Sequence, residues 1–110
     1  MFPDPDLPQY ASKLNSWAMG ERLIQRVFIF GSRVRGNHTS SSDIDIAVEL
    51  PYSDRNENLA HFQFEQLRWV NELSKILKHE VDVQLFEINH RSIVHRGVSE
   101  NSVLAYDRRC

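Results

Sequence analysis

The chain has 110 residues, of which 13 are lysine or arginine and 15 are aspartate or glutamate, so its formal net charge is −2. This length supports one domain that can bury its own core. With 41% apolar and 25% charged residues, the composition excludes a wholly disordered chain. The balanced charge argues against a nucleic-acid coat protein, so no direct binding of nucleic acid is expected.

The N-terminus and the hydrophobic runs limit the cellular setting. No apolar run approaches the roughly 20 residues that span a bilayer, so no membrane association is expected. Residues 1–8, rich in proline and aspartate, are expected to form a loose arm ahead of a domain over residues 9–107. The arm lacks the features of a signal peptide, and the single cysteine, Cys110, is expected to be an inert terminus. These features favour a cytoplasmic protein.

The first third of the chain predicts a helix, a strand and a loop. Apolar residues at spacings of three and four predict a helix over residues 8–23, which Gly20 can end early. The run Val-Phe-Ile-Phe at residues 27–30 is typical of a buried strand. Residues 31–42 are polar, so we expect a loop with one helical turn after Ser32.

The middle of the chain predicts a second strand and a long helix. Residues 43–50 begin by alternating acidic and β-branched residues, as a strand does. Residues 54–78 carry the longest helical pattern, and its expected core stripe consists of Leu59, Phe62, Leu67, Val70, Leu73 and Leu77. Phe64 and Trp69 lie off this stripe, so we expect them to form a second apolar face for a partner.

The last third predicts three short elements. Residues 81–86 alternate again and indicate a third strand. A short helix is expected over residues 89–96 with Gly97 as its C-cap, followed by a packed segment over residues 102–106. Three strands with helices between them predict an α/β or α+β fold, in which helices cover a small mixed sheet.

A polar stretch after the first predicted strand has the residues of a phosphate cradle. Gly31 and Ser32 follow that strand, where exposed backbone N–H groups and a hydroxyl can bind an anion. Arg33 and Arg35 add two cations, and Gly36 lets the backbone close around a ligand. For both arginines, a solvated position in the loop is as compatible with the sequence as a phosphate contact.

Three aspartates supply candidate metal ligands. Asp43 and Asp45 lie two residues apart on a predicted strand, so their side chains point to the same face. Two such carboxylates repel each other unless a cation lies between them, and Mg²⁺ bound together with substrate phosphates is the usual solution. Asp82 completes a three-carboxylate cluster if its strand pairs beside theirs. A phosphate cradle with an acid cluster predicts phosphoryl or nucleotidyl transfer.

These motifs resemble the minimal nucleotidyltransferase (MNT) family, whose members are small proteins of the DNA polymerase β-like nucleotidyltransferase superfamily. The resemblance covers residues 9–107 and rests on Gly31-Ser32, Arg33, Arg35 and Gly36, on Ser42-Asp43-Ile44-Asp45, and on Asp82. It implies the nucleotidyltransferase fold, with ATP as substrate and a pair of Mg²⁺ ions.

The resemblance also implies a role for each matched residue. The implied nucleotide-binding residues are Gly31, Ser32, Arg33, Arg35 and Ser42, and the first two would hold the triphosphate. The implied metal ligands and catalytic residues are Asp43, Asp45 and Asp82. Asp82 would also help to deprotonate the acceptor hydroxyl.

Members of this family are commonly antitoxins paired with HEPN-domain ribonuclease toxins, and some transfer AMP to a tyrosine of the toxin. The resemblance therefore implies a hetero-oligomer with a HEPN toxin and transfer of AMP to its hydroxyl. Two alternatives stay open. The chain could neutralise a toxin by binding and masking it without catalysis, or it could modify a small molecule such as an antibiotic. The five histidines lack a metal-binding spacing and are not expected to bind zinc.

Overall fold

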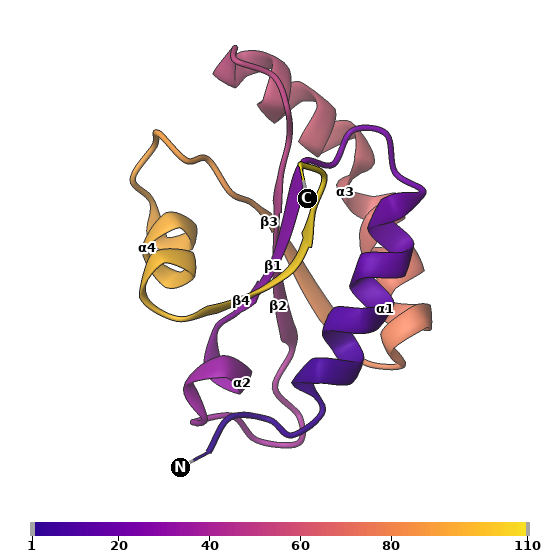
Figure 1. Cartoon of the computed structure of the whole chain (residues 1–110), viewed down its shortest axis with the longest axis vertical. Helices are drawn as coiled ribbons and strands as arrows, with labels where there is room; N and C mark the ends of the chain where they lie inside the picture. Colours follow the sequence, from indigo (N-terminus) through magenta and orange to yellow (C-terminus); the bar gives the residue numbers. More distant parts are fainter. Residues whose placement is uncertain (1, 110) are drawn as a thin grey trace.

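Four helices and four strands follow one another in the computed structural model, which describes residues 2–109 (Figure 1). In chain order they are α1 (Leu7–Met19), β1 (Arg26–Phe30), α2 (Ser32–Arg35), β2 (Ile44–Glu49), α3 (Arg55–Leu77), β3 (Val81–Leu85), α4 (Ile93–Glu100) and β4 (Ser102–Asp107). Cys110 lies outside the described residues, so the expectation for it stays a prediction.

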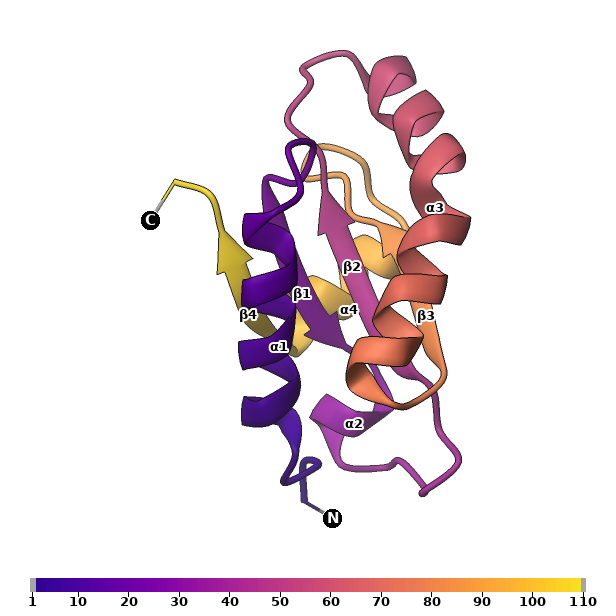
Figure 2. The ribbon, with the colours of Figure 1, turned by 90° about the vertical axis from the view of Figure 1, so that its right-hand side faces the viewer.

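The strands form one mixed sheet in the order β3-β2-β1-β4. β1 pairs antiparallel with both β2 and β4, whereas β2 and β3 are parallel. A parallel pair needs a crossover connection, and α3 supplies it. α1 and α3 cover one face of the sheet and α4 covers the other (Figure 2). The predicted α+β fold, with helices covering a small mixed sheet, is confirmed.

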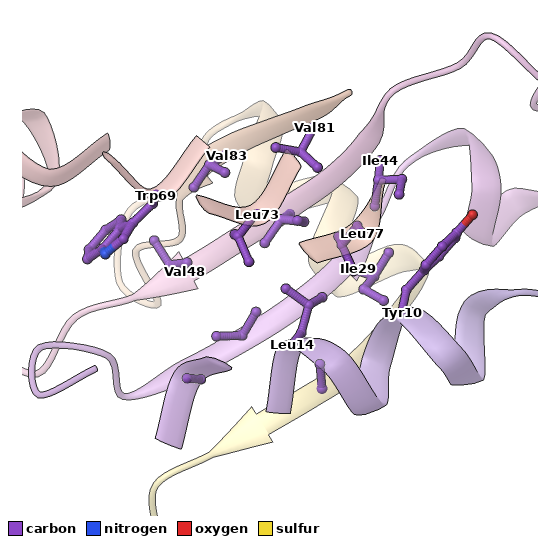
Figure 3. Packing of buried hydrophobic residues seen from close by; sticks show 14 of the residues in the cluster. Tyr10, Leu14, Ile29, Ile44, Val48, Trp69, Leu73, Leu77, Val81 and Val83 are labelled. Atoms are coloured by element: carbon purple, nitrogen blue, oxygen red, sulfur yellow. The ribbon is translucent and has the colours of Figure 1, made fainter. Parts of the chain in front are cut away.

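The main core lies between the sheet and the two long helices (Figure 3). Its fully buried side chains include Leu14, Ile29, Ile44, Ile46, Trp69, Leu73 and Val83. The opposite face of the sheet carries a second, smaller cluster, which consists of Phe28, Phe30, Ala47, Phe86 and Val98. Because successive strand residues alternate between faces, both clusters come from the same strands.

Both edges of the sheet are joined to a helix by a side-chain amide. Asn15 of α1 donates a hydrogen bond of 3.1 Å to the Ala105 carbonyl on β4. Gln66 of α3 donates one of 2.9 Å to the Val83 carbonyl on β3. These bonds occupy backbone acceptors on edge strands, where unpaired groups invite association with other chains. Within residues 2–109, no helix has the length and apolar character needed to cross a membrane.

Two helix ends differ from the predicted boundaries. α1 ends at Met19 with Gly20 as its C-cap, so the early stop is the one observed. α4 runs from Ile93 to Glu100 and passes through Gly97, so the prediction of Gly97 as its C-cap was wrong. The glycine serves packing instead, since a β-carbon there would lie 2.9 Å from Phe30 Cδ2. The packed segment after α4 is the edge strand β4.

The expected faces of α3 need two corrections. Leu67 is 72% exposed, so its assignment to the core stripe was wrong. Trp69 is fully buried, so it does not belong to a second apolar face, whereas Phe64 is exposed as that prediction requires. An α-helix turns about 100° per residue, so side chains two positions apart in sequence point about 200° apart around the helix axis. Leu67 therefore faces away when Trp69 faces the sheet.

The N-terminal segment is not loose. Asp4 is only 5% exposed, and its backbone N–H donates a hydrogen bond of 2.8 Å to the Arg33 carbonyl of α2. The backbone of Phe2 packs against Gly36, where a β-carbon would come within 2.7 Å of it. Proline and aspartate content favoured a mobile arm because such residues bury little apolar surface. In this structure, hydrogen bonds and an ion pair with α2 hold the segment in place although it buries little apolar surface.

Two leucines of α3 provide a test of the corrected core. Leu73→Ala is expected to lower the free energy of unfolding by about 2–5 kcal/mol, because it leaves a cavity in a fully buried site. Leu67→Ala is the matched control and should change it by no more than about 0.5 kcal/mol, because its side chain is exposed. Urea unfolding followed by circular dichroism measures both. Equal losses in the two variants would contradict the assignment of the buried face.

Candidate active site

Two of the predicted acidic residues lie side by side on the parallel strands. In the β2–β3 register, Asp45 is the partner of Asp82. Paired residues on parallel strands point to the same face, and neighbouring strands are about 4.8 Å apart. Asp43 is exposed and directly precedes β2. The strand pairing on which the expected cluster depended is therefore present.

The charge of these carboxylates is only partly compensated. The pKa of Asp45 is raised from its ordinary value of 3.8 to about 6. Burial is the largest cause, and the charges of Asp82 and Asp43 raise the pKa further. Arg35 and Arg33 oppose this rise without cancelling it. The site therefore has an excess of negative charge that a bound cation would neutralise.

Gly31 lies directly against this acidic pair. Its φ of +84° is in the region that favours glycine, and a β-carbon there would overlap the Asp45 carboxylate. Gly31 is the N-cap of α2, and its carbonyl accepts hydrogen bonds of 3.1 Å from the N–H groups of Val34 and Arg35 within that helix. The turn after β1 thus brings its backbone next to a carboxylate of β2.

The Arg33 side chain is engaged within the protein, and its predicted phosphate contact stays a prediction. Its side chain is only 6% exposed and forms an ion pair with Asp4. Its Nε and Nη2 donate hydrogen bonds of 3.1 and 2.7 Å to the Ser42 carbonyl, and Nη2 lies 2.8 Å from His79 Nε2. The guanidinium is therefore directed into the protein. Arg35 is exposed and acts on Asp45 through its charge, so its phosphate contact stays a prediction.

The two serines have different surroundings. Ser32 begins α2 and is half-buried, and its carbonyl accepts a hydrogen bond of 2.8 Å from the Gly36 N–H. The Ser42 hydroxyl accepts one of 2.9 Å from the Thr39 N–H, so it is used within the loop. Binding of nucleotide by Ser32 and Ser42 stays a prediction.

The acidic residues have the chemistry of a Mg²⁺ site, although they do not enclose one. In the stretch from residue 2 to residue 109, no three His, Cys, Asp or Glu side chains are grouped closely enough to hold a metal ion. Gln84 Nε2 donates a hydrogen bond of 2.9 Å to Asp82 Oδ1 and so occupies one oxygen. Carboxylate oxygens are the ligands that Mg²⁺ prefers, and the raised pKa of Asp45 reflects charge that such an ion would offset. Their service as ligands stays a prediction.

Three residues near the site carried no assignment from the sequence. Gln84 lies two residues after Asp82, so strand alternation alone could have placed it on the acidic face. Asp4 and His79 contact Arg33 across 29 and 46 residues of sequence, so no local pattern connects them to it.

Comparisons with known proteins identify the family. The family model of "Polymerase beta, Nucleotidyltransferase" matches residues 12–109. A protein of Methanocaldococcus jannaschii, named "Putative protein adenylyltransferase MJ1379", is 35% identical over 80 residues, which are 73% of this chain and 75% of that protein. The chain belongs to the polymerase β-like nucleotidyltransferases, as the resemblance to the MNT family implied.

Two solved structures share the fold. A toxin-antitoxin with AMP-PNP superposes with a TM-score of 0.66 at 19% identity, over 90% of this chain and 74% of that one. The tri-AMPylated HEPN toxin of Shewanella oneidensis in complex with MNT antitoxin gives a TM-score of 0.61 at 17% identity, over 93% of this chain and 73% of that one. Membership of the family implies a nucleotide substrate and a divalent metal.

Substitution of Gly31 tests the close approach of the turn to Asp45. Gly31→Ala is expected to lower the free energy of unfolding by about 1–3 kcal/mol and to weaken ATP binding, because the new methyl group overlaps the carboxylate at a positive φ. Gly20→Ala is the matched control, since its nearest atom, the Trp17 carbonyl oxygen, would be 3.6 Å away. Denaturant unfolding and calorimetric titration with ATP measure both. Similar behaviour of the two variants would contradict this packing.

The raised pKa of Asp45 predicts a pH-dependent cost in stability. The folded protein holds the Asp45 proton more tightly than the unfolded chain, so stability falls as the pH rises from about 4 to about 6. Asp45→Asn should therefore be more stable than the parent protein at pH 7.5, by at most about 3 kcal/mol, and should lose this advantage below pH 4. Urea unfolding with a chelator present measures the difference. No gain at pH 7.5 would contradict the inference that burial and the neighbouring carboxylates destabilise the charged form of Asp45.

Proposed function

We propose that this protein transfers AMP from ATP, with Mg²⁺, to a hydroxyl of a protein partner, and that the acceptor is a tyrosine of a cognate HEPN toxin. One observation carries the proposal. Asp45 and Asp82 are paired across parallel strands, with Asp43 close enough to affect the pKa of Asp45. Carboxylates in such a group are used to bind divalent ions in phosphoryl and nucleotidyl transfer.

The proposed reaction balances as an in-line displacement. The acceptor oxygen forms a bond to the α-phosphorus of ATP while the bond from that phosphorus to the oxygen bridging to the β-phosphate breaks. Pyrophosphate leaves, and the hydroxyl proton goes to a carboxylate, for which we propose Asp82. Mg²⁺ held by Asp43, Asp45 and Asp82 would supply charge neutralisation for the phosphates.

The turn after β1 gives the proposal its nucleotide site. Gly31 and Ser32 would hold the triphosphate beside the acidic residues, and Arg35 would add a positive charge from the exposed side of α2. We assign Arg33 no part in this contact, because its guanidinium is directed to Asp4 and the Ser42 carbonyl.

The choice of acceptor is supported by relatives. A similar fold occurs in an MNT antitoxin complex whose HEPN toxin is tri-AMPylated, and a relative at 35% identity is named as a candidate adenylyltransferase for proteins. Of the two alternatives, neutralisation of the toxin by binding alone does not explain why negative charge is grouped around the half-buried Asp45. Modification of a small molecule has no observation in its favour here.

Labelling of a partner tests the function. The chain is incubated with radiolabelled ATP, Mg²⁺ and the HEPN protein encoded beside its gene, and transfer is read by intact-mass spectrometry as a gain of one or more AMP units. The variant Asp43→Asn, Asp45→Asn should lose more than about 99% of the transfer rate, since it removes two of the proposed metal ligands. Glu57→Gln is the matched control and should keep it, because Glu57 follows the far end of β2 in the first turn of α3.

The outcomes separate the proposed function from masking. Labelling by the doubly substituted protein at the parent rate would overturn the assignment of the acids. Full neutralisation of the toxin by that protein, with no AMP attached, would favour masking. Loss of both labelling and neutralisation supports transfer as the mechanism.

A further inference from the structure

The N-terminal segment, residues 2–6, forms a strap across the turn that carries the proposed nucleotide site. Phe2 packs with its backbone against Gly36 at the end of α2. The Asp4 N–H donates to the Arg33 carbonyl, and the Asp4 carboxylate accepts from both the Arg33 guanidinium and the Asp6 N–H. The strap is therefore joined to α2 at both its backbone and its charged side chain.

Arg33 connects this strap to the segments that precede two of the acidic residues. Its contact with the Ser42 carbonyl fixes the residue immediately before Asp43. Its contact with His79 reaches the turn between α3 and β3, three residues before Asp82. One guanidinium thus touches the strap, the loop before β2 and the turn before β3.

The ion pair between Arg33 and Asp4 has the properties of a rigid structural contact. The side chains of Arg33 and Asp4 are 6% and 4% exposed, so both charges are largely shielded from solvent. Burial alone would raise the pKa of Asp4, but the Asp6 N–H and the Arg33 guanidinium lower it below its usual range. A guanidinium has five donors in a rigid planar arrangement, which a lysine cannot reproduce. Loss of one partner would leave the other charge buried and unpaired.

We propose that Arg33, held by Asp4 and His79, is a positioning residue that sets the placement of Asp43 and Asp82 for binding a metal–nucleotide complex. The inference rests on the proposed function, because it assumes that those carboxylates bind the metal. Its effect is expected to resemble that of other residues that support metal ligands, whose loss weakens metal binding about 10–100-fold.

The test compares two arginines that form ion pairs at opposite ends of the sheet, Arg33 with Asp4 and the partly buried Arg26 with Glu49. Arg33→Lys keeps a positive charge for Asp4 but cannot also reach the Ser42 carbonyl and His79. Arg26→Lys is the matched control, because Arg26 forms an ion pair with Glu49 at the end of β1 remote from Asp45. Arg33→Met is a second, more severe variant, and thermal unfolding checks that each protein is folded.

Two readouts are measured on the full chain. The first is the dissociation constant for Mn²⁺ with ATP, which should rise about 10–100-fold in Arg33→Lys and stay within about twofold in Arg26→Lys. The second is amide hydrogen exchange without metal, which should become faster in residues 37–43 in Arg33→Lys only. His79→Gln, which keeps an acceptor for Arg33, should behave as the parent protein does.

The outcomes distinguish this inference from the proposed function. Unchanged Mn²⁺–ATP binding in Arg33→Lys, or equal weakening in Arg26→Lys, would overturn the positioning role. If the parent protein and its Asp43→Asn, Asp45→Asn variant bind Mn²⁺–ATP equally, the proposed function fails. Hydrogen exchange then decides whether Arg33 holds the loop, and unchanged exchange in Arg33→Lys would overturn that as well.

Discussion

The parallel pairing of β2 with β3 is the constraint on which the rest of the molecule depends. It places Asp45 beside Asp82, and it requires a connection long enough to return to the same end of the sheet. α3 is that connection, and its buried stripe covers the face that carries Ile44, Ile46 and Val83. Alternation along the strands then leaves the aspartates on the opposite face, so the same residues that build the main core also determine where the acids lie.

The grouping of the aspartates lowers the stability of the fold, and packing of the rest of the sheet offsets this loss. Burial of Asp45 disfavours its charged form, and the carboxylates of Asp82 and Asp43 repel it, so its pKa is raised to about 6. The turn at Gly31 adds a second demand, because its backbone approaches Asp45 so closely that no side chain fits. The buried faces of α1 and α3 pack on one side of the sheet and stabilise the sheet that holds this unfavourable group. Strain concentrated at one end of a well-packed sheet is typical of a functional site.

Local patterns predicted the parts of the structure that depend on neighbours in sequence. Alternation located the strands and placed Asp43 and Asp45 on one face, and the glycine after β1 marked the turn. The sequence could not show which strands would pair, because pairing depends on the whole fold. It also misplaced Leu67 and Trp69, since both fit a helical spacing and only contact with the sheet decides which one is buried. The same limit applies to Asp4 and His79, which reach Arg33 from distant parts of the chain.

The two arginines of α2 belong to one sequence motif but have different surroundings, since Arg33 is buried and Arg35 is exposed. Arg33 and Arg35 are two residues apart on a helical turn, so their side chains point about 200° apart and cannot face the same ligand. Once the contacts with Asp4 and the Ser42 carbonyl direct Arg33 inward, Arg35 must point to solvent. The charge from α2 that remains accessible to a phosphate therefore comes from Arg35. Arg33, adjacent in sequence to Ser32, is instead a buried support for the loop that leads to Asp43.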